Sequence, residues 1–183
     1  MTLNKTVVLV GMMGSGKTAV GKVLAAALKV PFLDSDNEIS KAANRSISEI
    51  FERDGNDFFR VVESQVIKRL LCGPPCVLAT GGGAFMSTKN RTLIAHSGIS
   101  VFLNVDLEIL WERVRYNRSR PLLKTANPKA ALYKIFEDRK DQYSQADISI
   151  TSNDNCSIEQ TLQKLLSALS QRSDVLNWEK SKL

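Results

Sequence analysis

The residues with the clearest capacity for chemistry form the octapeptide Gly-Met-Met-Gly-Ser-Gly-Lys-Thr at positions 11–18. It matches the pattern G-x-x-x-x-G-K-[ST] in full. Glycines let backbone N–H groups converge on phosphate oxygens, Lys17 adds a positive charge at the β- and γ-phosphates, and the Thr18 hydroxyl can bind Mg²⁺. An apolar run at 6–10 precedes the loop and an amphipathic pattern at 18–29 follows it. The sequence therefore predicts a nucleotide-binding loop between a buried strand and a helix.

Two carboxylates, Asp34 and Asp36, follow the next predicted strand at 31–34. In an extended segment their side chains point the same way, because side chains alternate with a period of two. One could then approach Mg²⁺ through water while the other orients or deprotonates an acceptor hydroxyl. Alternatively, Asp36 caps a helix that begins at Asn37. The residues alone leave both roles open.

Basic and glycine-rich segments supply the remaining candidates. Arg60 and Arg139 carry guanidinium forks that match a carboxylate, although an ordinary surface ion pair would explain either one alone. Glycines at 81–83 end an apolar strand, which indicates close approach of a ligand or, alternatively, a tight turn. The loop around Arg120 fits a mobile lid that brings positive charge to a transferring phosphoryl group, or a plain basic loop.

These residues need a scaffold that brings them to one place. Strands are predicted at 6–10, 31–34, 76–80, 100–104 and 147–150, and helices at 18–29, 38–41, 46–54, 58–71, 107–116, 128–146 and 157–170. Such alternation predicts an α/β fold with a parallel sheet covered on both faces. Parallel sheets bind ligands at the carboxyl ends of their strands, where the candidate residues lie. The tail at 173–183 has little periodicity and is expected to fray.

The composition favours a single domain and a small anionic ligand. The chain has 183 residues and a formal net charge of +6. Three cysteines, with no matching metal-ligand pattern, indicate free thiols in a reducing compartment. The sequence has neither an apparent leader nor 18 consecutive apolar residues, so we expect a cytoplasmic protein without a membrane partner. Aromatic residues amount to 7% without basic–aromatic interleaving, which argues against a nucleic-acid partner.

Together these residues resemble the shikimate kinases, a family of P-loop kinases, from about residue 6 to residue 169. The motifs are GMMGSGKT at 11–18, DSD at 34–36, FFR at 58–60, ATGGG at 79–83, RPLL at 120–123 and DRKDQY at 138–143. The resemblance implies transfer of a phosphoryl group from ATP to the 3-hydroxyl of shikimate, with Mg²⁺. It also implies a monomer with a three-layer fold and a five-stranded parallel sheet in the order 2-3-1-4-5. An acceptor-binding segment at 36–62 and a lid at 115–127 would move on binding.

The resemblance also implies a role for each motif residue. Gly14, Ser15, Gly16 and Lys17 would hold the phosphates of ATP beside Ala19, which stands where relatives often have serine or threonine. Thr18 would bind Mg²⁺, and Asp34 would support it through water. Asp36 would be the base, Arg60 and Arg139 would hold the shikimate carboxylate, Gly82 would line the ring, and Arg120 would reach ATP from the lid. Residues 153–156 contain no arginine, so the adenine contact stays open.

Two other functions remain to be distinguished from this one. A gluconate-type kinase on the same scaffold would also use an aspartate and arginines. The resemblance favours shikimate, because residues matching Arg60, Arg139 and the three glycines form the pocket for a cyclic acid in the shikimate kinase family. A nucleotide-dependent regulatory module without turnover would tolerate the loss of Lys17 or Asp36. Both residues are present, which favours an enzyme.

Overall fold

A five-stranded parallel sheet forms the centre of the computed structural model, which describes residues 1–116, 121–123, 125–152 and 156–177. Its strands are β2 (Thr6–Val10), β3 (Phe32–Asp34), β4 (Val77–Ala79), β5 (Gly98–Val105) and β6 (Ile148–Ser152). They lie in the order β3-β4-β2-β5-β6. Numbered as the predicted strands, this is 2-3-1-4-5, so the predicted topology is confirmed.

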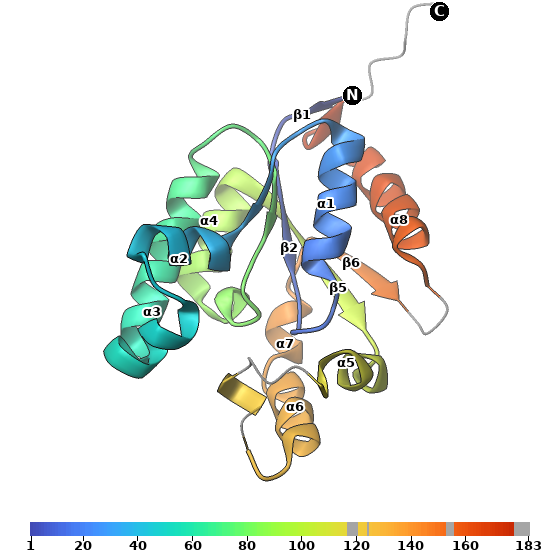
Figure 1. Cartoon of the computed structure of the whole chain (residues 1–183). Helices are drawn as coiled ribbons and strands as arrows, with labels where there is room; N and C mark the ends of the chain where they lie inside the picture. Colours follow the sequence, from blue (N-terminus) through green and yellow to red (C-terminus); the bar gives the residue numbers. More distant parts are fainter. Residues whose placement is uncertain (117–120, 124, 153–155, 178–183) are drawn as a thin grey trace, which may run out of the picture.

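Helices cover both faces of this sheet, as predicted, and give three layers (Figure 1). On β2, Val7 and Leu9 pack in one apolar cluster with α1 (Lys17–Leu28) and α8 (Ile158–Ser170). Val8 and Val10 point to the other face because side chains alternate along a strand. That face carries α2 (Ser35–Ala43), α3 (Ile47–Leu71) and α4 (Thr88–Ser97).

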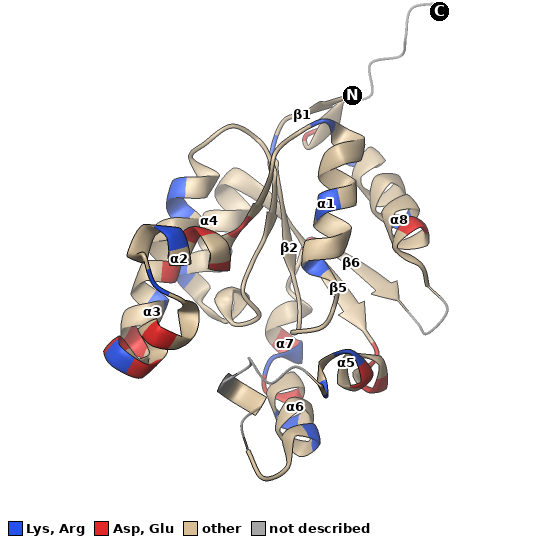
Figure 2. Ribbon diagram, viewed as in Figure 1, with Lys and Arg blue, Asp and Glu red and all other residues tan. Residues whose placement is uncertain are grey.

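The elements at the carboxyl end of the sheet surround the predicted ligand sites (Figure 1). They are α5 (Leu107–Val114), α6 (Pro128–Glu137), α7 (Lys140–Tyr143) and the 3-10 turns η1 (Ala84–Met86) and η2 (Pro121–Leu123). Figure 2 shows charged residues mainly on the helices, while β2 carries none along its length. Within the described part of the chain, no helix combines the length and apolar character needed to cross a membrane.

The helices agree with the prediction in part. The predicted helix at 128–146 is divided into α6 and α7, and α2 begins at Ser35 rather than at residue 38. The predicted helices at 46–54 and 58–71 are both present within α3, which is broken between them at Gly55 with φ 81° and ψ 174°. Positive φ is easily adopted by glycine, so the break has a local cause. Helix α4 was not predicted, because its sequence Thr-Lys-Asn-Arg-Thr-Leu-Ile-Ala-His-Ser shows only a weak apolar stripe.

The prediction that the tail frays from residue 173 is wrong for residues 173–177. Strand β7 (Leu176–Asn177) pairs antiparallel with β1 (Thr2–Leu3). Val175 and Leu176 are buried with Leu3 and Leu169. Burial of this apolar pair stabilises a segment too short to show periodicity. Residues 178–183 lie outside the described residues.

Candidate active site

The predicted phosphate loop links β2 to α1 and requires its glycines. Gly11, Gly14 and Gly16 have φ values of 141°, 82° and 90°. Residues that carry a Cβ rarely adopt such values, because the Cβ clashes with the backbone. A Cβ on Gly14 would also lie 2.7 Å from Cγ1 of Val114. Lys17 curls back over this loop, and its Nζ donates to the Gly11 and Met12 carbonyls at 2.8 Å each. The loop therefore presents a lysine beside backbone shaped to accept an anion.

Thr18 and Asp34 meet at the edge of this loop. The Thr18 hydroxyl donates to Oδ2 of Asp34 at 3.2 Å. Both side chains offer hard oxygen ligands, which suit Mg²⁺. Among the residues that the structure describes, no group of three or more His, Cys, Asp or Glu side chains could hold a metal. The site fits Mg²⁺, which is usually held by one or two protein groups together with phosphates and water.

Asp34, and not Asp36, caps helix α2. Oδ1 of Asp34 accepts from the backbone N–H groups of Asp36 at 3.1 Å and Asn37 at 3.4 Å. The segment 34–36 is not extended, because α2 begins at Ser35 and Asp36 lies in its first turn, so the argument from alternating side chains does not apply to the two aspartates. The alternative of Asp36 as a cap is wrong for the same reason. Both carboxylates nevertheless line the cavity at the phosphate loop.

A second cavity, of about 340 Å³, collects the four predicted acceptor residues Asp36, Arg60, Gly82 and Arg139. Its other walls are Met13, Ile47, Ser48, Phe51, Phe59, Glu63, Gly81, Gly83 and Leu122. Nη1 of Arg139 donates to the Gly82 carbonyl at 3.0 Å. Nη1 of Arg60 donates to Oε2 of Glu63 at 2.7 Å. The cavity thus pairs two guanidinium groups with a carboxylate at Asp36.

Glu63 belongs to this site and was not predicted from the sequence. Its side chain is 1% exposed, and Oε1 has no hydrogen-bond partner among the described residues. Burial raises the pKa of this carboxyl, while the charge of Arg60 lowers it. The signal that could have found it is its spacing of three residues from Arg60 on one helix face.

Two of the three glycines, Gly81 and Gly83, make room for charged side chains around the cavity. A Cβ on Gly81 would lie 2.7 Å from Oδ1 of Asp36 and 3.1 Å from Oε1 of Glu63. A Cβ on Gly83 would lie 2.6 Å from Nη2 of Arg60. Close approach of protein side chains therefore explains Gly81 and Gly83, whereas a Cβ on Gly82 would make only ordinary contacts, the nearest at 3.5 Å.

The acceptor cavity joins the phosphate loop directly. A cavity of about 350 Å³ at the loop is lined by Lys17, Thr18 and Asp34, and it shares Met13, Asp36, Gly81 and Gly82 with the acceptor cavity. Asp36 thus lies on the boundary between a place for phosphates and a place for an acceptor. That position suits a group that handles the proton of an attacking hydroxyl.

A third cavity, of about 320 Å³, lies on the other side of the loop. Gly14, Ser15, Gly16 and Ala19 line it, with Arg113, Ser152, Cys156 and apolar or hydroxyl groups of β5, α1 and α8. Nη1 of Arg113 donates to the Gly14 carbonyl at 3.1 Å. Arg113 was not predicted from the sequence as a site residue. Its contact with the loop arises from the packing of α5, which sequence spacing does not reveal.

The predicted lid is described only in part. Arg120 lies outside the described residues, so its predicted contact with ATP stays a prediction. Leu122, two residues later, lines the acceptor cavity.

Comparison with known proteins gives consistent matches. The model of the shikimate kinase family matches residues 13–170. The shikimate kinase of Ruegeria pomeroyi is 58% identical over 174 residues, which make up 95% of this chain and 89% of that protein. The structure of shikimate kinase from Acinetobacter baumannii in complex with shikimate has a TM-score of 0.86 at 36% identity, covering 92% of this chain and 94% of that one. A gluconokinase from Sinorhizobium meliloti has a TM-score of 0.62 at 18% identity, covering 93% and 94%, which is a likeness of fold alone.

Proposed function

The chain belongs to the shikimate kinase family, and from this we propose how its own residues transfer a phosphoryl group from ATP to shikimate. The protein is an ATP-dependent phosphotransferase with an alcohol acceptor. One observation carries the assignment of roles: the cavity with Arg60 and Arg139 opens onto the phosphate-loop cavity at Asp36. This arrangement suits an acceptor that carries both a carboxylate and a hydroxyl group.

Arg60 and Arg139 bind the shikimate carboxylate in this proposal. Guanidinium groups donate parallel hydrogen bonds to a carboxylate, and both arginines line the same cavity. Gly82 lines the ring, since its lack of a side chain leaves the cavity open beside Met13 and Arg139. The segments 36–62 and 115–127 move when the acceptor and ATP bind.

Asp36 acts on the 3-hydroxyl. Its carboxylate accepts the hydroxyl proton while the hydroxyl oxygen attacks the γ-phosphorus of ATP. The bond between that phosphorus and the β–γ bridging oxygen breaks, and ADP leaves with the electron pair. The products are shikimate 3-phosphate and ADP. Lys17, the N–H groups of residues 14–19 and Arg120 stabilise the negative charge on the transferring group.

Thr18 binds Mg²⁺, and Asp34 contributes through water. The bound ion would neutralise charge on the β- and γ-phosphates. Helix α2 holds Asp34 in place, because the same carboxylate caps its first turn. We further propose that the chain acts as a single domain and a monomer in the cytoplasm, without nucleic-acid or membrane partners.

A coupled assay of ADP release tests this function. Purified protein with ATP and Mg²⁺ is assayed with shikimate, with gluconate and with no acceptor, and the phosphorylated product is identified by mass spectrometry. We expect ADP release only with shikimate and Mg²⁺, and one phosphate added to the acceptor. Equal release without an acceptor would refute the proposed acceptor, and preferential use of gluconate would favour the alternative kinase.

A further inference from the structure

Tyr143 is a buried tyrosine to which neither the nucleotide site nor the acceptor site assigns a role. It ends helix α7, four residues after Arg139, and its backbone N–H donates to the Arg139 carbonyl at 3.0 Å. The side chain is fully buried. Its ring stacks on Phe102 of β5, with ring centroids 4.9 Å apart and planes 9° from parallel. The ring is therefore anchored to the central sheet.

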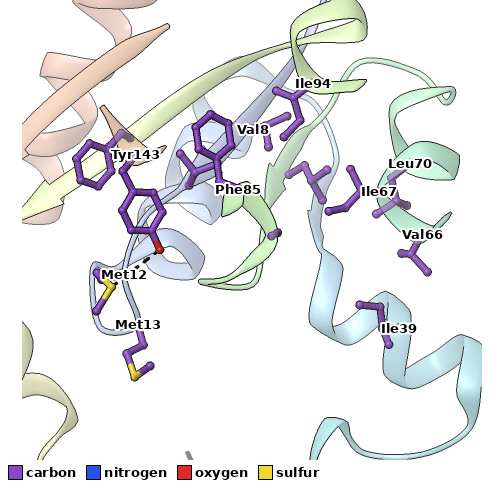
Figure 3. Close-up of a cluster of buried hydrophobic side chains, with 14 of the residues drawn as sticks. Val8, Met12, Met13, Ile39, Val66, Ile67, Leu70, Phe85, Ile94 and Tyr143 are labelled. Atoms are coloured by element: carbon purple, nitrogen blue, oxygen red, sulfur yellow. Dashed lines mark hydrogen bonds between the residues drawn. The ribbon is translucent and has the colours of Figure 1, made fainter. Parts of the chain in front are cut away.

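The Tyr143 hydroxyl contacts the backbone of a residue that lines the acceptor cavity. It donates to the Gly82 carbonyl, which also accepts from Nη1 of Arg139. A single carbonyl oxygen thus fixes two side chains from one helical turn, since its two lone pairs accept two donors. The same hydroxyl lies 4.0 Å from Sδ of Met12 in the phosphate loop, the contact dashed in Figure 3. The Tyr143 hydroxyl thus connects α7 with the phosphate loop and with the glycines at 81–83, three segments that are far apart in the sequence.

We propose that Tyr143 is a positioning residue for the acceptor. Through the shared Gly82 carbonyl it holds the Arg139 guanidinium in the direction required by the acceptor carboxylate. Because Tyr143 stacks on Phe102 and contacts Met12, it keeps this guanidinium at a fixed position relative to the phosphate loop. Tyr143 touches no substrate itself; it acts through Arg139 and Gly82. This inference rests on the proposed role of Arg139.

The geometry favours this role over filling of the core alone. A phenylalanine would fill the same space and stack on Phe102 equally well. The hydroxyl adds the hydrogen bond to Gly82 and the contact with Met12, which a phenylalanine cannot make. A buried hydroxyl without a partner would destabilise the fold. Arg139 donates one N–H to the same carbonyl, and a guanidinium has further N–H groups that can bind a ligand carboxylate. Loss of the hydroxyl leaves Gly82 with one donor and allows Arg139 and the glycine loop to shift together.

Tyr143→Phe tests the proposal, with Tyr133→Phe as its matched control. The control also removes a hydroxyl that donates a hydrogen bond, to Glu108 between α6 and α5, but it lies outside the acceptor cavity. We expect Tyr143→Phe to raise KM for shikimate about threefold to tenfold, the effect of one hydrogen bond. KM for ATP should change less than about twofold, and Tyr133→Phe should leave both constants unchanged.

A double-mutant cycle separates positioning from general packing. On the Arg139→Ala background, Tyr143→Phe should raise KM for shikimate by a clearly smaller factor than in the parent protein. An equal factor on both backgrounds, an equal rise in KM for both substrates, or a lower melting temperature with unchanged constants would each overturn the inference. If Arg139→Ala raises KM while Tyr143→Phe does not, only this inference fails. If the parent protein does not phosphorylate shikimate, the proposed function fails instead.

Discussion

Gly83→Ala should displace Arg60 without disturbing the backbone. Gly83 has φ −100° and ψ −8°, which alanine adopts without strain. An added Cβ would lie 2.6, 2.8 and 2.9 Å from Nη2, Nη1 and Cζ of Arg60. Since carbon and nitrogen atoms in contact need about 3.5 Å, the guanidinium must move by most of an ångström. It forms the end of a flexible side chain that is 31% exposed, so it has space to move outward.

The displaced guanidinium should lose a hydrogen bond to the acceptor carboxylate. A hydrogen bond to a charged group contributes roughly 1.5–3 kcal/mol, so KM for shikimate should rise by about tenfold to a hundredfold. The ion pair with Glu63 should weaken as well and lower the melting temperature modestly. Gly83 does not line the phosphate-loop cavity, so KM for ATP should stay within about twofold of its original value.

Steady-state kinetics of four proteins test this reasoning: the parent, Gly83→Ala, Arg60→Ala and the double variant. If the added methyl acts by displacing Arg60, it should have almost no effect on KM once Arg60 is alanine. A full additional rise of KM in the double variant would refute the displacement, and an unchanged KM in Gly83→Ala would refute the role of Arg60 in binding.

Three further predictions concern charge and protonation. Lys17→Ala should remain folded by circular dichroism but lose about 10²–10³ in kcat, the usual effect of removing one preorganised donor, and wild-type turnover would contradict the role of the loop. Asp36→Asn should lower kcat by about 10²–10⁴ with little change in KM for ATP, and an unchanged kcat would exclude Asp36 as the base. Burial raises the pKa of Tyr143 from 10.0 to about 12. Its neutral form is therefore favoured in the folded state, and stability should fall as pH rises from about 10 to 12, because the unfolded chain loses this proton first. Urea unfolding should show a smaller loss over this window for Tyr143→Phe, and an equal loss would contradict the shift.

Local patterns in the sequence were sufficient for most of the fold. The apolar run at 6–10 and the glycine loop after it predict β2 and α1, since each pattern extends over one element. Ser157 and Gln160 form a capping box at the start of α8, and their residue types and spacing are visible in the sequence. The tail could not be predicted in this way, because Leu176 is stabilised by pairing of β7 with β1 and by burial with Leu3, near the other end of the chain.

Site residues that belong to a sequence motif could be named from the sequence. Residues whose contacts depend on tertiary packing could not. Asp36, Arg60, Gly82 and Arg139 were predicted as acceptor residues, and the structure brings them to one cavity. Asp36 was offered as a helix cap from the sequence, whereas Asp34 is the cap in the structure, because the start of a helix is uncertain by a residue or two from sequence. Arg113 reaches the loop only because α5 packs beside it, and no local pattern indicates that contact.

Arg139 is proposed to bind the carboxylate of shikimate beside the phosphate loop. The most direct test compares kcat/KM for shikimate and for an analogue that lacks the carboxylate, in the parent protein and in Arg139→Ala. We expect the parent to use the analogue poorly, and Arg139→Ala to reduce kcat/KM for shikimate about tenfold or more while leaving that for the analogue unchanged. Equal reduction for both acceptors would contradict the account, because Arg139 would then support the scaffold or the nucleotide rather than the carboxylate.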